Sequence, residues 1–107
     1  MLYEDENGCV SFHADMWNDG EMVISRLYVK PDRRGHKAGY KLLDWAKNWA
    51  KTYGYKALNL EVWPFEALGR IEEARMTKAL IKYYSAYGFK SMKTNKSRMK
   101  LKLQEAS

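Results

Sequence analysis

The stretch Asp32–Leu43, DRRGHKAGYKLL, decides the fold of this chain. It places Arg33, Arg34, His36 and Lys37 at the point where a loop turns into an apolar helical pattern. A helix start carries unpaired backbone N–H groups and the positive end of the peptide dipole, so cations are locally unfavourable there. A strongly anionic ligand at this point removes the conflict. The sequence therefore predicts an anion site where the loop enters the helix.

The segments on either side of this stretch predict a βαβ crossover. Before it, Val23–Val29 is typical of a buried strand, and Pro31 ends that strand because proline cannot donate to the ladder. After it, Leu42–Tyr53 places its apolar residues on one helical stripe, and Gly54 is placed to cap the helix. Ala57–Val62 then alternates as a strand. A strand, a helix and a strand in this order imply two parallel strands.

The N-terminal segment predicts an antiparallel meander. A short strand at Leu2–Tyr3 and a longer one at Cys9–Trp17 flank a turn, and residues 18–20, Asn-Asp-Gly, form the next turn. On the longer strand we expect one buried face made of Val10, Phe12, Ala14 and Met16.

The C-terminal half predicts a second helix followed by two strands. The helix runs to Tyr87 before Gly88, and its apolar stripe is Met76, Ala79, Leu80, Tyr83, Tyr84 and Tyr87. Phe89–Met92 and Met99–Leu103 are expected to close the sheet. The fold class is therefore α+β, a mixed and mostly antiparallel sheet with a central βαβ crossover and flanking helices.

Length and composition indicate one globular domain over residues 1–107, with 46% hydrophobic residues. No apolar run reaches the roughly 20 residues that span a bilayer, and the acidic first ten residues lack the basic and apolar regions typical of a signal peptide, so we expect no membrane partner. Cys9 is the only cysteine, which excludes an internal disulfide and favours a reducing cytoplasm. Together with His13 and His36 it falls short of a structural zinc set, so no metal is expected.

The net charge of +6 is concentrated in one segment. Residues 90–102 contain six cations and no acid, whereas the remaining cations and acids balance. Such a cluster can bind nucleic acid or an acidic protein surface. Alternation of these cations with apolar residues favours the solvent-facing side of a terminal hairpin instead.

The run LYVKPDRRGHKAGYKLLDWA resembles the central motif of the GNAT superfamily of acetyl-CoA-dependent N-acetyltransferases, roughly V-x-P-x-x-R-G-x-G-x-G-x-x-L-L. The matching positions are Val29, Pro31, Arg34, Gly35, Gly39, Leu42 and Leu43. Downstream, residues 83–89 are similar to the family's F-Y-x-x-x-G-F ending, and together the resemblance covers about residues 9–103. The dinucleotide pattern G-x-G-x-x-G and the P-loop pattern are both absent.

This resemblance implies acetyl-CoA as co-substrate and assigns residues to it. Its diphosphate would be bound by the turn and helix start, Arg34, Gly35, His36, Lys37, Ala38 and Gly39. The pantetheine arm would lie along the backbone of a splayed strand at Leu27, Tyr28 and Val29. Thr77 stands where many members have an asparagine that contacts the cofactor.

The chain also departs from the family pattern. Lys37 replaces the usual glycine, where it alters the approach of the backbone or adds an ion pair to the diphosphate. The segment 64–76, PFEALGRIEEARM, is longer than usual, and Pro64 favours a helix start there. The family's usual first strand and first two helices have no counterpart, so the resemblance is to a compact, N-terminally trimmed member whose acceptor side the longer segment would enclose.

The resemblance places Tyr84 at the family's general-acid tyrosine, although the apolar stripe equally predicts a core residue. Glu61 is the candidate general base, with Glu21 and Glu66 as alternatives, and it also fits a surface position on its strand. The implied function is transfer of an acetyl group to a primary amine, a protein lysine or N-terminus. The alternatives are a GNAT-fold acyl-CoA binder without catalysis and a basic nucleic-acid-binding domain. Exposed final strands allow a dimer.

Overall fold

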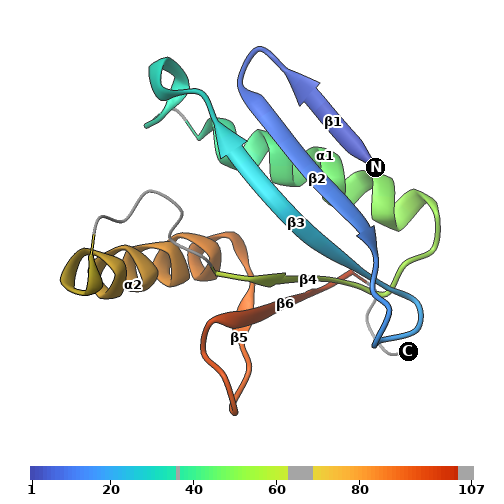
Figure 1. Ribbon diagram of the computed structural model, residues 1–107. Helices are drawn as coiled ribbons and strands as arrows, with labels where there is room; N and C mark the ends of the chain where they lie inside the picture. Colours follow the sequence, from blue (N-terminus) through green and yellow to red (C-terminus); the bar gives the residue numbers. More distant parts are fainter. Residues whose placement is uncertain (36, 63–68, 104–107) are drawn as a thin grey trace.

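A computed structural model describes residues 1–35, 37–62 and 69–103 of the chain (Figure 1). Six of its strands form one sheet in the order β1-β2-β3-β4-β6-β5. The strands are β1 (Leu2–Asp5), β2 (Gly8–Ala14), β3 (Glu21–Val29), β4 (Ala57–Glu61), β5 (Lys90–Ser91) and β6 (Arg98–Lys102). The helices are α1 (Ala38–Thr52) and α2 (Arg70–Tyr87), with a short 3₁₀ turn, η1 (Pro31–Arg33), after β3. The predicted α+β architecture is confirmed.

Strands β3 and β4 form the parallel pair that the βαβ crossover predicts, and the other neighbouring strands pair antiparallel. The parallel pairing runs from Glu21 opposite Ala57 to Ile24 opposite Leu60 and then stops. Beyond Ile24, β3 continues to Val29 without β4 beside it. Figure 1 shows the two strands diverging from this point, which we call the fork.

A β-bulge lies at the fork. In the β2–β3 ladder Ser11 pairs with Arg26 and Phe12 pairs with Ile24, so Ser25 is an extra residue on β3. The Ser25 hydroxyl donates to the Ser11 backbone carbonyl across 3.1 Å. A bulge bends its strand and increases the local twist. Its position explains why β3 leaves β4 directly after Ile24.

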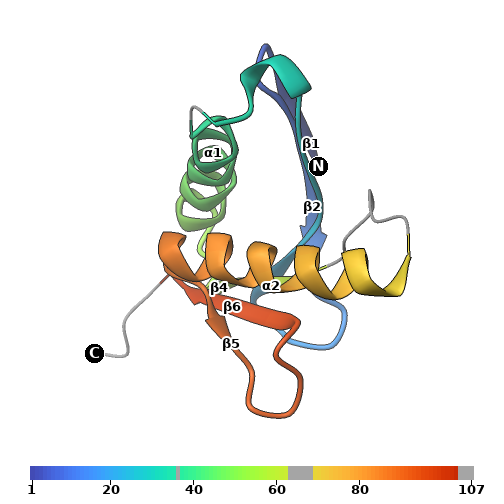
Figure 2. The same cartoon turned by 90° about the vertical axis from the view of Figure 1, so that its left-hand side faces the viewer.

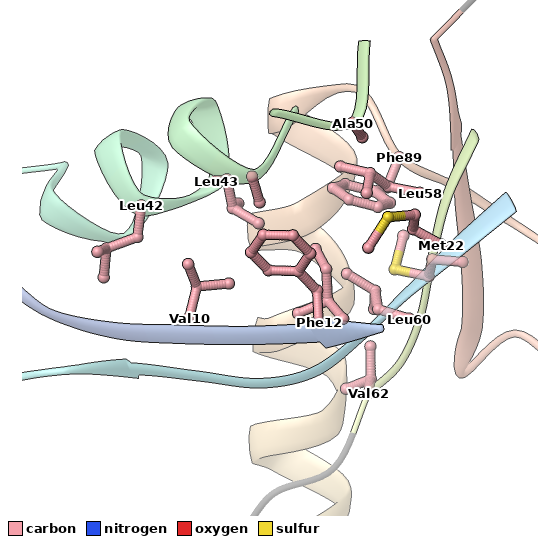
Figure 3. Packing of buried hydrophobic residues seen from close by; sticks show 13 residues of the cluster. Val10, Phe12, Met22, Leu42, Leu43, Ala50, Leu58, Leu60, Val62 and Phe89 are labelled. Carbon is pink, nitrogen blue, oxygen red and sulfur yellow. The ribbon is translucent and has the colours of Figure 1, made fainter. Parts of the chain in front are cut away.

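Both helices pack on one face of the sheet. Alternation brings the apolar residues of β2, β3, β4 and β6 to that face, where they meet the stripe of α1 (Figure 3). Rings from the two helices also touch, since the Tyr40 ring centroid lies 4.7 Å from that of Tyr83 and 5.0 Å from that of Tyr87. Figure 2 shows α2 running across the direction of α1. The fully buried large side chains are Val10, Phe12, Met22, Leu42, Leu43, Leu58, Phe89 and Met99.

The predicted buried face of β2 is right at Val10 and Phe12 and wrong at Ala14 and Met16. Strand β2 ends at Ala14, which is exposed, and Met16 is 90% exposed. The cause is Asp15, whose carboxylate accepts the N–H groups of the two residues after Met16 and closes a turn. The strand predicted from alternation alone ended at Trp17, three residues after the observed end of β2.

The helices end as predicted, just before Gly54 and Gly88, but their exposed margins differ from the predicted stripes. Tyr53 follows the last residue of α1 and is 65% exposed, and Ala79 of α2 is exposed. Helix α2 has no buried residue, because mainly its C-terminal turns reach the core. The helix predicted to start at Pro64 falls on residues 63–68, which lie outside the described residues. No helix in the described ranges is long and apolar enough to cross a bilayer.

Candidate functional site

The start of α1 presents backbone donors that have no partner among the described residues. An α-helix leaves the N–H groups of its first turn without intrahelical partners, and in α1 these groups belong to Ala38, Gly39 and Tyr40. The first helical bond runs from the Lys41 N–H to the Lys37 carbonyl across 3.2 Å. The first turn of α1 contains no acidic side chain. The donors and the helix dipole therefore face the loop, as an anion site requires.

The loop before α1 has left-handed backbone at two positions. Gly35 has φ +86°, which favours glycine, and Lys37 has φ 59° and ψ 23° as the N-cap residue of α1. Lys37 thus has a left-handed backbone that a glycine would adopt without strain, and its side chain is exposed. Lys37 therefore adds a charge without removing the turn. His36 lies outside the described residues.

The free edge of β3 faces the gap beyond the fork. The Lys30 N–H donates to the Asn7 carbonyl across 2.8 Å, so Lys30 points to the β1–β2 turn. Because successive residues of a strand alternate in the direction of their backbone groups, those of Leu27 and Val29 point into the gap. The Val29 carbonyl accepts a hydrogen bond there from Arg34 Nε across 3.0 Å. The backbone groups of Leu27 and the N–H of Val29 therefore face the gap where a pantetheine arm is predicted, and the Val29 carbonyl is engaged by Arg34.

Tyr28 contributes its ring, since by the same alternation its backbone faces β2. The guanidinium carbons of Arg26 and Arg34 lie 5.5 Å and 5.8 Å from its ring centroid. Such cation–π contacts hold both side chains against the Tyr28 ring. Two cations therefore pack against the Tyr28 ring, and sequence reasoning identified Arg34 but not Arg26.

Helix α2 meets the start of α1 at Gly39. A Cβ atom at Gly39 would overlap the Tyr83 hydroxyl and lie 3.4 Å from Val29 Cγ2. The absence of a side chain at Gly39 therefore lets α1, α2 and the end of β3 come together. The family motif marks Gly39, but the reason for glycine at this position becomes visible only in the structure.

Tyr84 lies beside this junction, with its ring centroid 5.2 Å from that of Tyr83 and 5.8 Å from that of Phe89. It packs against the core as a partly buried residue. Its hydroxyl has no hydrogen-bond partner among the described residues. Burial raises the pKa of Tyr84 to about 12, so the hydroxyl keeps its proton at neutral pH. A protonated, unengaged hydroxyl can act as a proton donor.

Glu61 ends β4 directly after the fork residue Leu60. Its side chain is exposed on the sheet face opposite to the helices, and it has no ion-pair partner within the described ranges. Tyr84 is on the helix-covered face. The structure thus places the two candidate catalytic residues on opposite faces of the sheet.

Thr77 lies apart from the start of α1. Thr77 is on α2, six residues before Tyr83, or about 9 Å along the helix axis. It lines a hollow of about 950 Å³ with Lys78, Ile81 and Ser97. Thr77 is therefore not brought to the start of α1. The alternative base Glu66 lies outside the described residues.

Glu21 belongs to a network that sequence reasoning missed. Its carboxylate accepts from Asn59 Nδ2 across 2.8 Å and pairs with Lys100 Nζ at 2.8 Å. Asn59 Nδ2 also donates to Asp15 across 3.0 Å. Partial burial acts to raise the pKa of Asp15, but hydrogen bonds from Asn18, Asn59 and Trp17 outweigh it and lower the pKa to about 2. The four residues come from separate segments, so no local motif announces the network.

The basic segment forms the terminal hairpin that alternation predicts. Five of its six cations are exposed, and Lys100 is the one that pairs with Glu21. The cations therefore occupy mainly the solvent-facing positions of β5, β6 and their connection.

Several solved structures share this fold. A GNAT-family acetyltransferase from Staphylococcus aureus superposes with a TM-score of 0.72 at 15% identity, over 96% of this chain and 66% of that one. A GNAT-family protein from Desulfovibrio desulfuricans gives a TM-score of 0.72 at 17% identity, over 95% and 66% of the two chains. The ribosomal-protein-S18-alanine N-acetyltransferase from Escherichia coli gives 0.61 at 19% identity, over 92% and 63%. The chain thus spans less than two thirds of the length of these proteins.

No curated protein sequence matches the chain. The family model for the acetyltransferase (GNAT) domain matches residues 1–91, which include the fork, the loop before α1 and the tyrosines of α2. The chain therefore belongs to the GNAT acetyltransferase family.

Proposed function

We propose that the chain is an acetyl-CoA-dependent N-acetyltransferase that acts on a primary amine of a protein, a lysine side chain or an N-terminus. The observation that supports this proposal most directly is the fork. Strand β3 continues from the fork through η1 to the N–H groups at the start of α1. Helix α2 contacts the start of α1 at Gly39. One continuous path thus joins an anion site to a gap in the sheet.

The residues of this path fit coenzyme A. The diphosphate would take the N–H groups of Ala38, Gly39 and Tyr40, with Lys37 as an additional cation. The pantetheine arm, which carries peptide-like amides, would pair with the backbone of Leu27 and Val29 as a strand does. When bound, acetyl-CoA supplies the activated acetyl thioester.

Tyr84 and Glu61 would handle the protons of the transfer. The acceptor must lose one proton to become a neutral amine, and Glu61 would receive this proton through water. The amine nitrogen then forms a bond to the thioester carbon while the C–S bond breaks. Tyr84 would donate its proton to the departing sulfur and regain one from the nitrogen through solvent. The two residues can divide these roles because they lie on opposite faces of the sheet.

A protein acceptor is favoured by the open face of the sheet. Both described helices pack on the other face, so Val23, Asn59 and Glu61 border a surface that a large acceptor can approach. The E. coli enzyme named above carries a ribosomal protein in its name and shares the fold. A small enclosed metabolite would need walls that the described residues do not build.

Calorimetry with acetyl-CoA followed by a thiol-release assay tests the proposal. We expect one acetyl-CoA to bind per chain, and free thiol to appear when lysine-containing peptides are added. A ligand at 100 times its Kd stabilises the native state by about 2.7 kcal/mol, so a thermal shift gives an independent readout. Binding without thiol release from any acceptor would favour the non-catalytic acyl-CoA binder, and no binding would refute both.

A further inference from the structure

A groove of about 420 Å³ crosses the open face of the sheet and connects two loops to the fork. Trp17 and Asn18 of the β2–β3 loop border one side, and Met92 and Arg98 border the other. Val23 and Glu61 line it at the fork itself. The groove therefore leads from the loops to the place where acyl transfer is proposed.

The β2–β3 loop presents two large apolar side chains to solvent. Met16 is 90% exposed and Trp17 is 94% exposed, whereas the other tryptophans within the described residues pack against the core. Exposed apolar side chains beside a groove are typical of protein-interaction sites. Met92, which is 43% exposed, lies on the opposite side of the groove. The groove thus has an exposed apolar side chain on each side.

The loop is held in place by the network around Asp15. Its carboxylate accepts the Trp17 N–H across 2.8 Å and the backbone and side-chain N–H groups of Asn18 across 3.1 and 3.0 Å. Asn59 then connects Asp15 to Glu21, which pairs with Lys100. These bonds tie the loop to β3, β4 and β6. Trp17 is therefore held on an ordered turn, which lowers the conformational cost of binding a partner.

The charges of the groove suit a cationic side chain at the fork. The carboxylates that line it are Asp15 and Glu61, the cations that line it are Arg98 and Lys100, and Glu21 lies next to it as the partner of Lys100. Asp15 is saturated by hydrogen bonds and Glu21 is paired with Lys100. Glu61 forms no ion pair with Arg98 or with any other described residue, although Arg98 is its cross-strand neighbour. The available carboxylate is thus the one at the fork.

We propose that this groove is the docking site of an extended acceptor segment that carries a lysine next to an apolar residue. The ammonium group points to Glu61, and the apolar neighbour contacts Trp17 and Met92. The inference rests on the proposed acetyl transfer and narrows its acceptor to lysine in an exposed, extended segment. Arg98 and the cations of the terminal hairpin disfavour basic residues elsewhere in that segment.

Peptide binding tests the site without requiring turnover. The probes are labelled seven-residue peptides with a central lysine flanked by leucine, the same peptide flanked by serine, and the leucine peptide with norleucine for lysine. Fluorescence anisotropy is measured with and without coenzyme A. We expect wild-type protein to bind the leucine–lysine peptide at least about tenfold more tightly than Trp17→Ala does, because tryptophan dominates many interfaces. Tyr53→Ala, an exposed aromatic residue at the far end of α1, should bind like wild type.

The controls separate the possible results. Equal binding by wild type and Trp17→Ala, equal binding of the norleucine peptide, or no peptide binding would overturn the proposed docking site. The same holds if sedimentation shows a wild-type dimer that Trp17→Ala dissociates, because the face would then be a self-interface. Acetyl-CoA calorimetry runs in parallel. Peptide binding without acetyl-CoA binding would refute the transferase and leave the docking face established.

Discussion

Replacing Lys37 by glycine tests the backbone of the turn before α1. Lys37 has φ 59°, a left-handed conformation that costs a residue with a Cβ about 1–2 kcal/mol. Glycine removes this strain but loses about 0.4–1 kcal/mol through the greater freedom of the unfolded chain. We therefore expect Lys37→Gly to stabilise the fold by about 1 kcal/mol net, or about 4–8 °C in Tm for a domain of this size.

Lys37→Ala provides the matched control, since alanine removes the charge but keeps the strain. Its free energy of unfolding should stay within about 0.5 kcal/mol of that of the wild type, the usual range for an exposed position. Both variants should weaken acetyl-CoA binding by a similar factor, up to about fivefold for one exposed charge contact. Scanning calorimetry and acetyl-CoA titration measure the two effects. If Lys37→Ala gained as much stability as Lys37→Gly, or if Lys37→Gly lost stability, the left-handed turn would be wrong.

Three further changes have defined outcomes. Tyr84→Phe should slow acetyl transfer about 10²-fold or more while acetyl-CoA affinity stays within twofold, because general acid catalysis contributes about 10²–10⁴-fold; an unchanged rate would exclude Tyr84 as the proton donor. Gly39→Ala should destabilise the protein in urea despite a helix-propensity gain of about 1 kcal/mol, since the new Cβ overlaps the Tyr83 hydroxyl, and Tyr83→Phe should recover part of the loss. Asp15 has a folded pKa of about 2 against an unfolded value of 3.8, so its contribution to stability is present above pH 4 and is lost as the pH falls toward 2. Asp15→Asn should flatten that part of the stability profile, and a profile identical to wild type would contradict the assignment.

The order of strands and helices could be predicted because its signals are local. The alternation of Val10 and Phe12, the helical stripe from Leu42 and the prolines and glycines at the element ends each act within a few residues. A strand, a helix and a strand then force the parallel pair. Met16 was predicted wrongly because a single Asp15 side chain closes a turn that the alternation does not reveal.

The part of the candidate site that is built from one contiguous stretch of backbone could be proposed from the sequence. The contacts between side chains that are distant in the sequence could not. Gly35 and Gly39 belong to a contiguous motif, so the candidate anion site could be proposed from the sequence. The bulge at Ser25, the Tyr83–Gly39 contact and the bonds from Asp15 through Asn59 to Lys100 depend on strand register and helix placement. Exposed loop residues such as Trp17 give no periodic signal at all, which is why the groove was not predicted.

Amide NMR during a coenzyme A titration tests the proposed binding site, because backbone N–H groups would hold the coenzyme. We expect the largest shifts at the N–H groups of Gly35 and Ala38–Tyr40 and at those of Leu27 and Val29, with no comparable change in residues 90–102. Shifts confined to the basic terminal hairpin, or no shifts at a saturating concentration, would contradict the fork as the coenzyme A site.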